Sequence, residues 1–156
     1  SRGLGDVYKR QLDEQVAAND NWNMVTQQTA EWNAETAQQI VQSVIDSGKE
    51  FNVIYAENDD MAKGAVAALD KANISHGVGK DVIVMGFDCN KWALEELLAG
   101  NWNYDGQCNP FQASYIDAII KDLQAGKAPA EKTIIMDEKG FDASTITQED
   151  VDNYGI

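Results

Sequence analysis

The chain has 156 residues, with 26 Asp and Glu against 12 Lys and Arg, and therefore a formal net charge of −14 at pH 7. This charge argues against nucleic acid or an anionic membrane surface as a partner, because phosphate groups are bound by basic surfaces. Hydrophobic residues make up 44% of the chain, enough for a buried core, and no segment approaches the roughly 20 apolar residues that cross a bilayer.

The first eleven residues, SRGLGDVYKRQ, show neither helix nor strand periodicity and lack the apolar stretch of a signal peptide. We interpret residues 1–11 as a non-native or mis-assembled leader and leave them out of the fold prediction. With no signal peptide in view, the residues themselves indicate no compartment.

A short strand and an amphipathic helix are predicted next. Residues 24–30, MVTQQTA, carry Val and Thr at positions that favour a strand. Asn33 is a favourable N-cap for the helix that follows, and Gly48 suits its C-terminal end. The apolar residues of that helix recur at helical spacing: Ala37, Ile40, Val41, Val44 and Ile45.

Two apolar strands, each followed by a helix, form the middle of the chain. FNVIYA (51–56) and DVIVMGFD (81–88) are apolar almost throughout, as expected of strands that are covered on both faces. Helices are predicted after them at 60–72 and 91–100, and Gly100 closes the second helix.

The last third of the chain predicts two further strands and two further helices. NYDGQCN (103–109) is a strand, and Pro110 suits the first turn of the helix after it. KTIIMD (132–137) is predicted as the last strand. The spacing Thr147-x-x-Asp150 indicates a capping box at the start of a short terminal helix.

Strands and helices alternate along the chain with short connections. This alternation is typical of right-handed βαβ units, and strands that are apolar throughout are typical of buried parallel sheets. We therefore predict an α/β fold, with a parallel open sheet and helices on both of its faces.

Polar and aromatic residues follow the predicted strands where each strand ends. They are Trp32, Asn58, Asp88, Gln107 and Asn109. In open α/β sheets, ligands bind beyond the carboxyl ends of the strands. An aromatic ring can cover the apolar face of a sugar, while amide and carboxylate groups pair with its hydroxyls. The sequence predicts a site for a polyhydroxylated ligand at this edge.

Three of these residues also have an ordinary structural explanation. Asn58 and Asp59 suit the cap and first turn of the next helix, Asp88 can simply end its strand, and Trp32 suits the edge of a core. Their coincidence at one sheet edge favours a ligand site. Within AENDD we predict that Asn58 points at the ligand, whereas Asp59 and Asp60 form the first helical turn.

Catalytic and metal-binding patterns are absent from the sequence, which contains no GxSxG elbow, Walker A loop or HExxH. AENDD does not follow the calcium-binding EF-hand pattern. We predict neither an enzyme nor a cofactor or metal. Cys89 and Cys108 are expected to be free thiols; a disulfide stays the alternative, because sequence alone does not place their Cα atoms.

Three segments carry a resemblance to a known family. YAENDDMAKGAVAAL, DVIVMGFDCNKWALEELLAGNWN and QCNP resemble the periplasmic sugar-binding proteins of ABC importers, of the ribose/galactose type (type I fold). Among these, the galactofuranose-binding members are the most similar. The resemblance covers about residues 12–156, since TITQEDVDNY is similar to the short C-terminal segment of these proteins.

The resemblance implies two α/β lobes that close by a hinge on a pentose or hexose, with a galactofuranose-like sugar among the candidate ligands. It implies a permease of the cytoplasmic membrane as partner, with the protein either periplasmic or an extracellular lipoprotein of a Gram-positive cell. The sugar contacts of the family fall on Trp32, Asn58 and Asp88. A further contact maps only loosely to Gln107 and Asn109, because a cysteine occupies the aligned position between them.

The resemblance also implies a division of the chain. Residues 12–105 are expected to form most of the C-terminal, sugar-binding lobe, and residues 106–156 to cross over to an incomplete N-terminal lobe before the C-terminal tail. The returning segment, 110–137, would build part of that first lobe. Its helix would then expose an apolar face in the present chain, favouring aggregation or dimerisation.

The leading function is therefore the substrate-binding component of an ABC sugar importer, which binds and delivers a monosaccharide without chemistry. The alternative is the effector-binding domain of a LacI-type transcription regulator, which shares this fold and similar strand ends. A sugar-converting α/β enzyme is a third class and would require turnover of the sugar.

Overall fold

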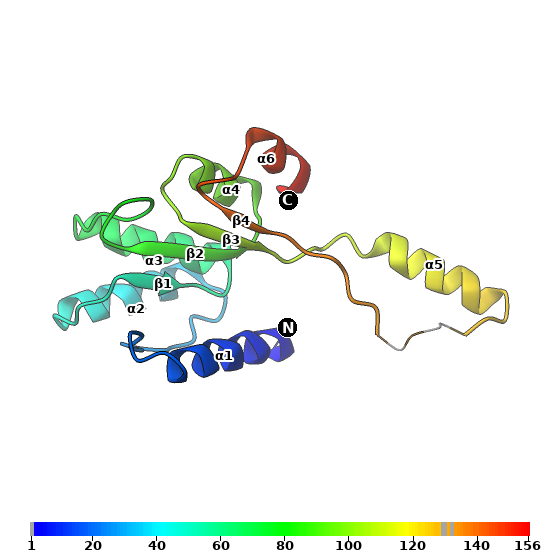
Figure 1. Cartoon of the computed structure of the whole chain (residues 1–156), viewed down its shortest axis with the longest axis horizontal. Coiled ribbons are helices and arrows are strands. Elements are labelled where there is room, and N and C mark those ends of the chain that lie inside the picture. Colours follow the sequence, from blue (N-terminus) through cyan, green and yellow to red (C-terminus); the bar gives the residue numbers. More distant parts are fainter. Residues whose placement is uncertain (1, 129–130, 132) are drawn as a thin grey trace.

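The computed structural model describes residues 2–128, 131 and 133–156 of the protein (Figure 1). Strands and helices alternate through most of it, as the sequence predicts for an α/β domain. The elements are α1 (Arg2–Ala17), α2 (Ala34–Asp46), β1 (Val53–Tyr55), α3 (Asp59–Lys71), β2 (Ile83–Asp88), α4 (Lys91–Leu98), β3 (Tyr104–Gln107), α5 (Ala113–Gln124), β4 (Gly140–Asp142) and α6 (Gln148–Tyr154).

The strands form one four-stranded sheet in the order β1-β2-β3-β4. β1, β2 and β3 are parallel, as predicted, whereas β4 runs antiparallel to β3. The register pairs Gly86 with Asp105 and Asp88 with Gln107. Because paired residues point to the same face, the side chains at the carboxyl ends of β2 and β3 are neighbours.

Helices α2 and α3 lie directly against each other. A Cβ on Gly64 of α3 would lie only 2.0 Å from the carbonyl oxygen of Ala34, the first residue of α2. Only glycine allows this approach, because any larger side chain would overlap the α2 backbone. α2 is capped as predicted, since Asn33 Oδ1 accepts the backbone N–H of Thr36 at 2.9 Å.

A single hydrophobic core joins the sheet to α3, α4 and α6. Trp102, 1% exposed, is its largest fully buried side chain, and the Trp92 ring meets it edge-on at 5.8 Å between centroids. The other buried members are Ala56, Ala62, Leu69, Val82, Val84, Cys89, Ala93, Leu94, Leu97, Phe141, Ile146 and Val151. Burial of these apolar groups holds the helices against the sheet.

The opposite face of the sheet is covered less completely than the continuous apolar pattern predicted. Val53 and Ile83 are paired on this face and are 45% and 38% exposed. Tyr55, Phe87 and Tyr104 form a row of aromatic contacts, with ring centroids 5.3 and 6.4 Å apart. Both faces of the strands are therefore apolar, but the described helices bury the face toward α3, α4 and α6 more completely than the opposite face.

Two predicted strands are wrong, for the same physical reason. Residues 24–30 form no strand, and neither do 133–137; residue 132 of the second prediction lies outside the described residues. A strand needs a partner for its backbone hydrogen bonds, and neither segment pairs with the sheet among the described residues. The apolar side chains of the second segment are left exposed, with Ile135 at 87%.

The first residues of the chain, which show no helical period in the sequence and are left out of the fold prediction, are helical in the structure. Residues 2–11 belong to α1, which continues without interruption to Ala17. Over the whole of α1, helix-favouring Arg, Leu, Lys, Gln, Glu and Ala outnumber the two glycines.

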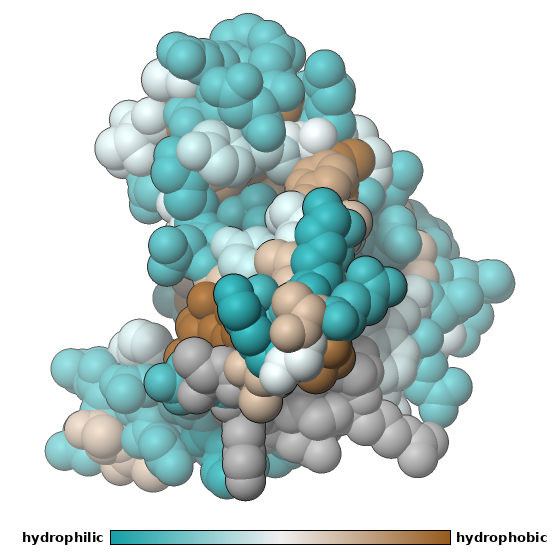
Figure 2. Space-filling model, turned by 90° about the vertical axis from the view of Figure 1, so that its right-hand side faces the viewer, coloured by the Kyte–Doolittle hydropathy of each residue, from teal (hydrophilic) through white to brown (hydrophobic). Residues whose placement is uncertain are grey.

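Helix α5 projects away from the rest of the molecule (Figure 1). Seen from that side, apolar residues alternate with polar ones on the projecting part (Figure 2). Its exposed apolar side chains include Tyr115, Ile116, Ile120 and Leu123, and no residue of α5 is buried. The predicted exposure of this helix is confirmed.

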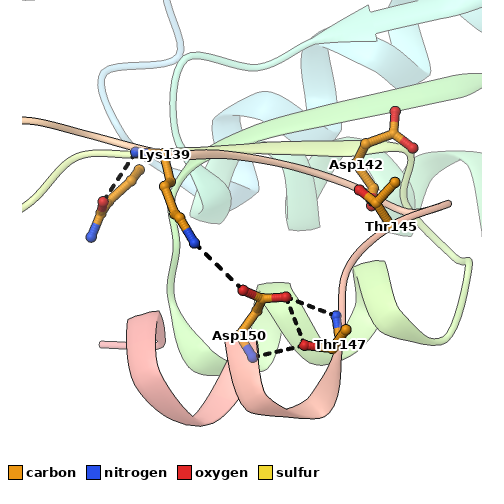
Figure 3. Close-up of polar contacts among 6 residues, drawn as sticks. Lys139, Asp142, Thr145, Thr147 and Asp150 are labelled. Carbon is orange, nitrogen blue, oxygen red and sulfur yellow. Dashed lines mark hydrogen bonds and ion pairs between the residues drawn. The ribbon is translucent and has the colours of Figure 1, made fainter.

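The terminal helix α6 begins at the predicted capping box (Figure 3). Thr147 Oγ1 accepts the Asp150 backbone N–H at 3.2 Å, and Asp150 Oδ2 accepts the Thr147 backbone N–H at 3.0 Å. Lys139 Nζ lies 3.7 Å from Asp150 Oδ1 and so links the segment before β4 to α6. Over the described part of the chain, no helix has both the length and the apolar character to cross a membrane.

Candidate ligand-binding site

Asn58 lies at the tip of β1 and caps α3. Its backbone is extended, and its Oδ1 accepts the Met61 backbone N–H at 2.9 Å. Asn58 is buried, with only 7% of the residue exposed. This bond confirms the capping explanation for Asn58, and it does not use the Nδ2 donor of the same side chain, so that capping and ligand binding are compatible.

Asp88 lies at the tip of β2 in an unusual backbone conformation. Its φ is 130°, and that of Cys89 is 63°, so both residues occupy the region that favours glycine. Burial raises the pKa of the Asp88 carboxyl, while a hydrogen bond from the Asp59 backbone N–H opposes this rise and the Asp60 charge adds to it. The Asp88 carboxylate is therefore held at the N-terminus of α3, where the positive end of the helix dipole stabilises it.

Asp59 connects the two strand tips directly. Its Oδ2 accepts the Asn90 backbone N–H at 2.8 Å and the Asn90 side-chain amide at 3.1 Å. The residue is fully buried, whereas Asp60 beside it is exposed. Both lie in the first turn of α3, as predicted, but Asp59 does more than complement the helix dipole: it fixes the turn that follows Asp88.

A second buried carboxyl, Asp105 of β3, faces Asp59. Both residues are 0% exposed. Burial raises the pKa of each carboxyl, and the charge of Asp59 raises that of Asp105 further, to about 9. The Cys89 thiol donates to Asp105 Oδ1 at 3.8 Å, and burial with nearby acids raises the pKa of that thiol.

Sequence reasoning missed Asp105 and the part played by Asp59. The available signal was the position of Asp105 in the interior of a predicted strand, between Tyr104 and Gly106. Carboxyl groups are almost never fully buried unless they are paired, so an acid at such a position indicates a partner.

Gln107 and Asn109 lie at the end of β3 but are bonded to the segment before β4. The Gln107 side-chain oxygen accepts the Lys139 backbone N–H at 3.2 Å. The Asn109 backbone N–H donates to Glu138 Oε1 at 2.8 Å, and Asn109 Oδ1 accepts the Phe111 N–H at 2.9 Å. Gln107 is paired with Asp88 in the sheet, but its side-chain oxygen already accepts the Lys139 N–H.

Trp32 lies in the loop before α2 and is 54% exposed. Its φ of 57° and the φ of 54° at Glu31 turn the chain sharply just ahead of the Asn33 cap. Trp32 is therefore not a member of the hydrophobic core that the described residues form. No ring contact or hydrogen bond in the described residues joins Trp32 to Asn58 or Asp88, and the structure groups only these last two closely with Asp59.

The two thiols are free, as predicted: Cys89 is buried and Cys108 is exposed. Within the described ranges, no three His, Cys, Asp or Glu side chains are arranged to hold a metal ion. The chemical groups at the edge are hydrogen-bond donors and acceptors around a row of carboxyls, which suits recognition of neutral hydroxyl groups.

Comparison with known proteins identifies the family. The profile of a family described as "Periplasmic binding protein domain" matches residues 5–128. The fructose import binding protein FruE of Bifidobacterium longum is 33% identical over 135 residues, covering 85% of this chain and 39% of FruE. This chain therefore spans about two fifths of the length of that relative.

Solved structures agree on the fold. One from Mycobacterium smegmatis in complex with β-D-fucofuranose has a TM-score of 0.75 at 26% identity, covering 84% of this chain and 42% of that one. A galactofuranose binding protein has a TM-score of 0.81 at 23% identity, covering 94% and 49% of the two chains, and supports the fold alone. These comparisons confirm the α/β class and the predicted resemblance. Since the family profile matches well over half of its residues, the chain belongs to the periplasmic binding protein domain family.

Proposed function

We propose that this protein is the substrate-binding part of an ABC sugar importer and holds a monosaccharide at the edge that carries Asn58 and Asp88. The observation that carries the proposal is the direct linkage of the two strand tips: the Asp59 backbone N–H bonds Asp88, and the Asp59 carboxylate bonds Asn90. The relatives support a pentose or hexose, because FruE is a fructose import binding protein and one similar structure holds a fucofuranose. The protein binds this sugar without catalysing a reaction.

The proposed ligand contacts have different roles. Asn58 Nδ2 donates to a sugar oxygen while Oδ1 keeps the α3 cap, and the Asp88 carboxylate accepts from vicinal hydroxyls. Trp32 offers an exposed ring that can stack on the apolar face of the sugar. Gln107 and Asn109 are weaker candidates, because both side-chain oxygens already accept backbone N–H groups.

The other side of the site is proposed to come from a first lobe. Residues 12–105 then form most of the second lobe. Residues 106–156 contain the crossover, in which α5 packs into the first lobe, and the C-terminal tail, in which β4 and α6 pack against the described sheet and core. Two observations support this division. The chain spans 39% of the length of FruE, and α5 carries exposed apolar side chains that a second lobe would cover.

A permease partner and a location outside the cytoplasmic membrane complete the proposal. Both follow from the import function of the relatives, and the periplasm, or the outer surface of a Gram-positive cell, is where such a receptor meets its sugar. The relatives named above are an import binding protein and sugar-binding structures, which favours a receptor over the regulator alternative.

A thermal-shift screen of pentoses and hexoses against the complete gene product tests the function. We expect one narrow class of sugar to raise the melting temperature, since a ligand that binds only the folded state stabilises it. A second measurement follows the sugar by chromatography and is expected to find it unchanged. Formation of a product would show that the protein is an enzyme rather than a receptor. If no sugar raises the melting temperature, the proposed function is wrong.

A further inference from the structure

We propose that Asp59 and Asp105 share one proton as a buried acid pair, and that this pair positions the Asp88–Asn90 turn so that ligand affinity falls when the proton is lost at alkaline pH. The inference rests on the proposed function for its effect on affinity. The pair and its control of the turn are observable without any sugar.

The first support is the hydrogen bonding of the two carboxyls. Asp59 Oδ2 accepts two N–H groups of Asn90, and Asp105 Oδ1 accepts the Cys89 thiol. The remaining oxygens, Asp59 Oδ1 and Asp105 Oδ2, are buried and accept from no N–H or O–H donor in the described part of the chain. Two such oxygens are satisfied together if one carries a proton and donates it to the other.

The second support is the space between α3 and the sheet. A Cβ on Gly86 of β2 would lie 2.6 Å from Asp59 Oδ1 and 2.7 Å from Trp102 Cζ3. Gly86 is paired with Asp105 in the sheet, so the Asp59 carboxyl reaches β3 across the position that a side chain would fill. The missing side chain at Gly86 is therefore what allows the two carboxyls to meet.

The third support is the charge around the pair. The titratable groups that act on it are Asp88 and Cys89 at the tip of β2, while Asp60 of α3, Tyr104 of β3 and Asp142 of β4 lie around the same cluster. None of these is a cation. Lys63 of α3 lies over the Trp92 ring, and no described ion pair includes Asp59 or Asp105. A proton is the positive charge that this cluster can retain.

The consequence falls on the turn that carries Asp88. Asp88 and Cys89 have positive φ, a conformation that persists only where neighbouring contacts hold it. The contacts are the two Asp59–Asn90 hydrogen bonds, the Cys89–Asp105 bond and the Ile156 N–H donated to the Cys89 carbonyl at 3.0 Å. Loss of the shared proton leaves two carboxylates in contact, and their repulsion moves apart the groups that hold this turn.

NMR of the 156-residue chain tests the pair without a ligand. The Asn90 amide is expected to shift in a titration from roughly pH 7.5 to roughly pH 10, as the shared proton leaves. Asp105→Asn removes the titrating group but keeps an N–H donor toward Asp59, so the Asn90 amide should then stay constant. Asp60→Asn, an equal charge change on the exposed neighbour, should leave the titration as it is. The shared proton is disproved if the NMR signal of the Asn90 amide does not shift with pH in the unmodified chain. It is also disproved if that signal shifts equally in Asp105→Asn.

Calorimetry on the complete gene product tests the effect on affinity. Sugar affinity is expected to fall about three- to tenfold across the same pH range, and Asp105→Asn should abolish that fall. Sugar binding that shows the same pH dependence in Asp105→Asn overturns the positioning role. A titrating Asn90 amide in a protein that binds no sugar contradicts only the proposed function, so the two failures are distinguishable.

Discussion

Asp59 Oδ2 accepts both the backbone N–H and the side-chain amide of Asn90, at 2.8 and 3.1 Å. These two hydrogen bonds join the N-terminus of α3 to the turn after β2, 31 positions further along the chain. Asn58, directly before Asp59, and Asp88, two positions before Asn90, are the proposed sugar contacts. The site can therefore be altered at either tip while the link between them is kept.

Asn58 is predicted to have two separable roles. Asn58→Ala should lower the free energy of unfolding by about 0.5–2 kcal/mol, because the Met61 N–H loses its cap. Asn58→Ser should keep most of that stability, since serine is also a good cap. Both variants should weaken sugar binding by about 1–3 kcal/mol through loss of the Nδ2 donor.

Urea unfolding and calorimetry measure the two roles of Asn58 independently. Wild-type affinity in Asn58→Ser would show that only the cap matters and that Asn58 does not contact the sugar.

Asp105→Asn is predicted to stabilise the chain increasingly as pH rises. The pKa of Asp105 is raised from 3.8 to about 9 by burial and by Asp59, so the folded chain binds more protons than the unfolded chain. The stability that this proton contributes is fully present below the pKa of the unfolded chain. It is lost as pH rises through the pKa of the folded chain. The asparagine has no charge to bury and avoids that loss.

Unfolding in urea at roughly pH 4, 6.5 and 9 gives the measurement for Asp105→Asn, with Asp60→Asn as the matched charge control. The difference from wild type should be small at the lowest pH and largest at the highest. A difference that is constant with pH would mean that Asp105 does not hold a proton in the folded chain.

Thr147→Ala is predicted to destabilise α6 by about 1 kcal/mol, because the capping box loses its hydroxyl (Figure 3). Thr147→Ser keeps the hydroxyl and is the matched control. The hydroxyl also lowers the pKa of Asp150, so its removal should bring that pKa back toward the ordinary value. Equal stability of the Ala and Ser variants in thermal unfolding would argue that this cap contributes nothing.

Ile120→Glu in α5 is predicted to leave the stability of the present chain nearly unchanged and to reduce its self-association. Ile120 is 47% exposed on a helix that buries no residue. In the complete gene product the same change should lower stability by about 1–3 kcal/mol or more, because the side chain would face the first lobe. Sedimentation of the chain and thermal unfolding of both proteins provide the readouts. Equal stability of the complete protein with and without this change would contradict the proposed crossover.

Much of the fold could be predicted because it depends on local patterns. The apolar runs at 51–56 and 81–88 contain β1 and β2, and Asn58 begins α3 where the sequence places a cap. The segments 24–30 and 133–137 could not be predicted in this way. Their composition favours strands, but a strand depends on a partner elsewhere, and neither finds one in the described sheet.

The candidate site could be predicted only in part. The rule that ligands bind beyond the carboxyl ends of strands located Asn58 and Asp88 at one edge, and the structure links them through Asp59. The pairing of Asp59 with Asp105 depends on sheet register and on the space left by Gly86. Neither register nor that space is visible in a single sequence.

The sugar affinity of Asp88→Ala in the complete gene product, measured by calorimetry beside Asp60→Asn, tests the central claim most directly. Asp88 should be a hydrogen-bond acceptor for the ligand, so its loss should weaken binding by about 1–3 kcal/mol, roughly five- to 150-fold. The exposed Asp60 makes a similar charge change on the same helix end and should leave affinity nearly unchanged. Unchanged affinity in Asp88→Ala would contradict the account, because the sugar would then bind somewhere other than this edge of the sheet.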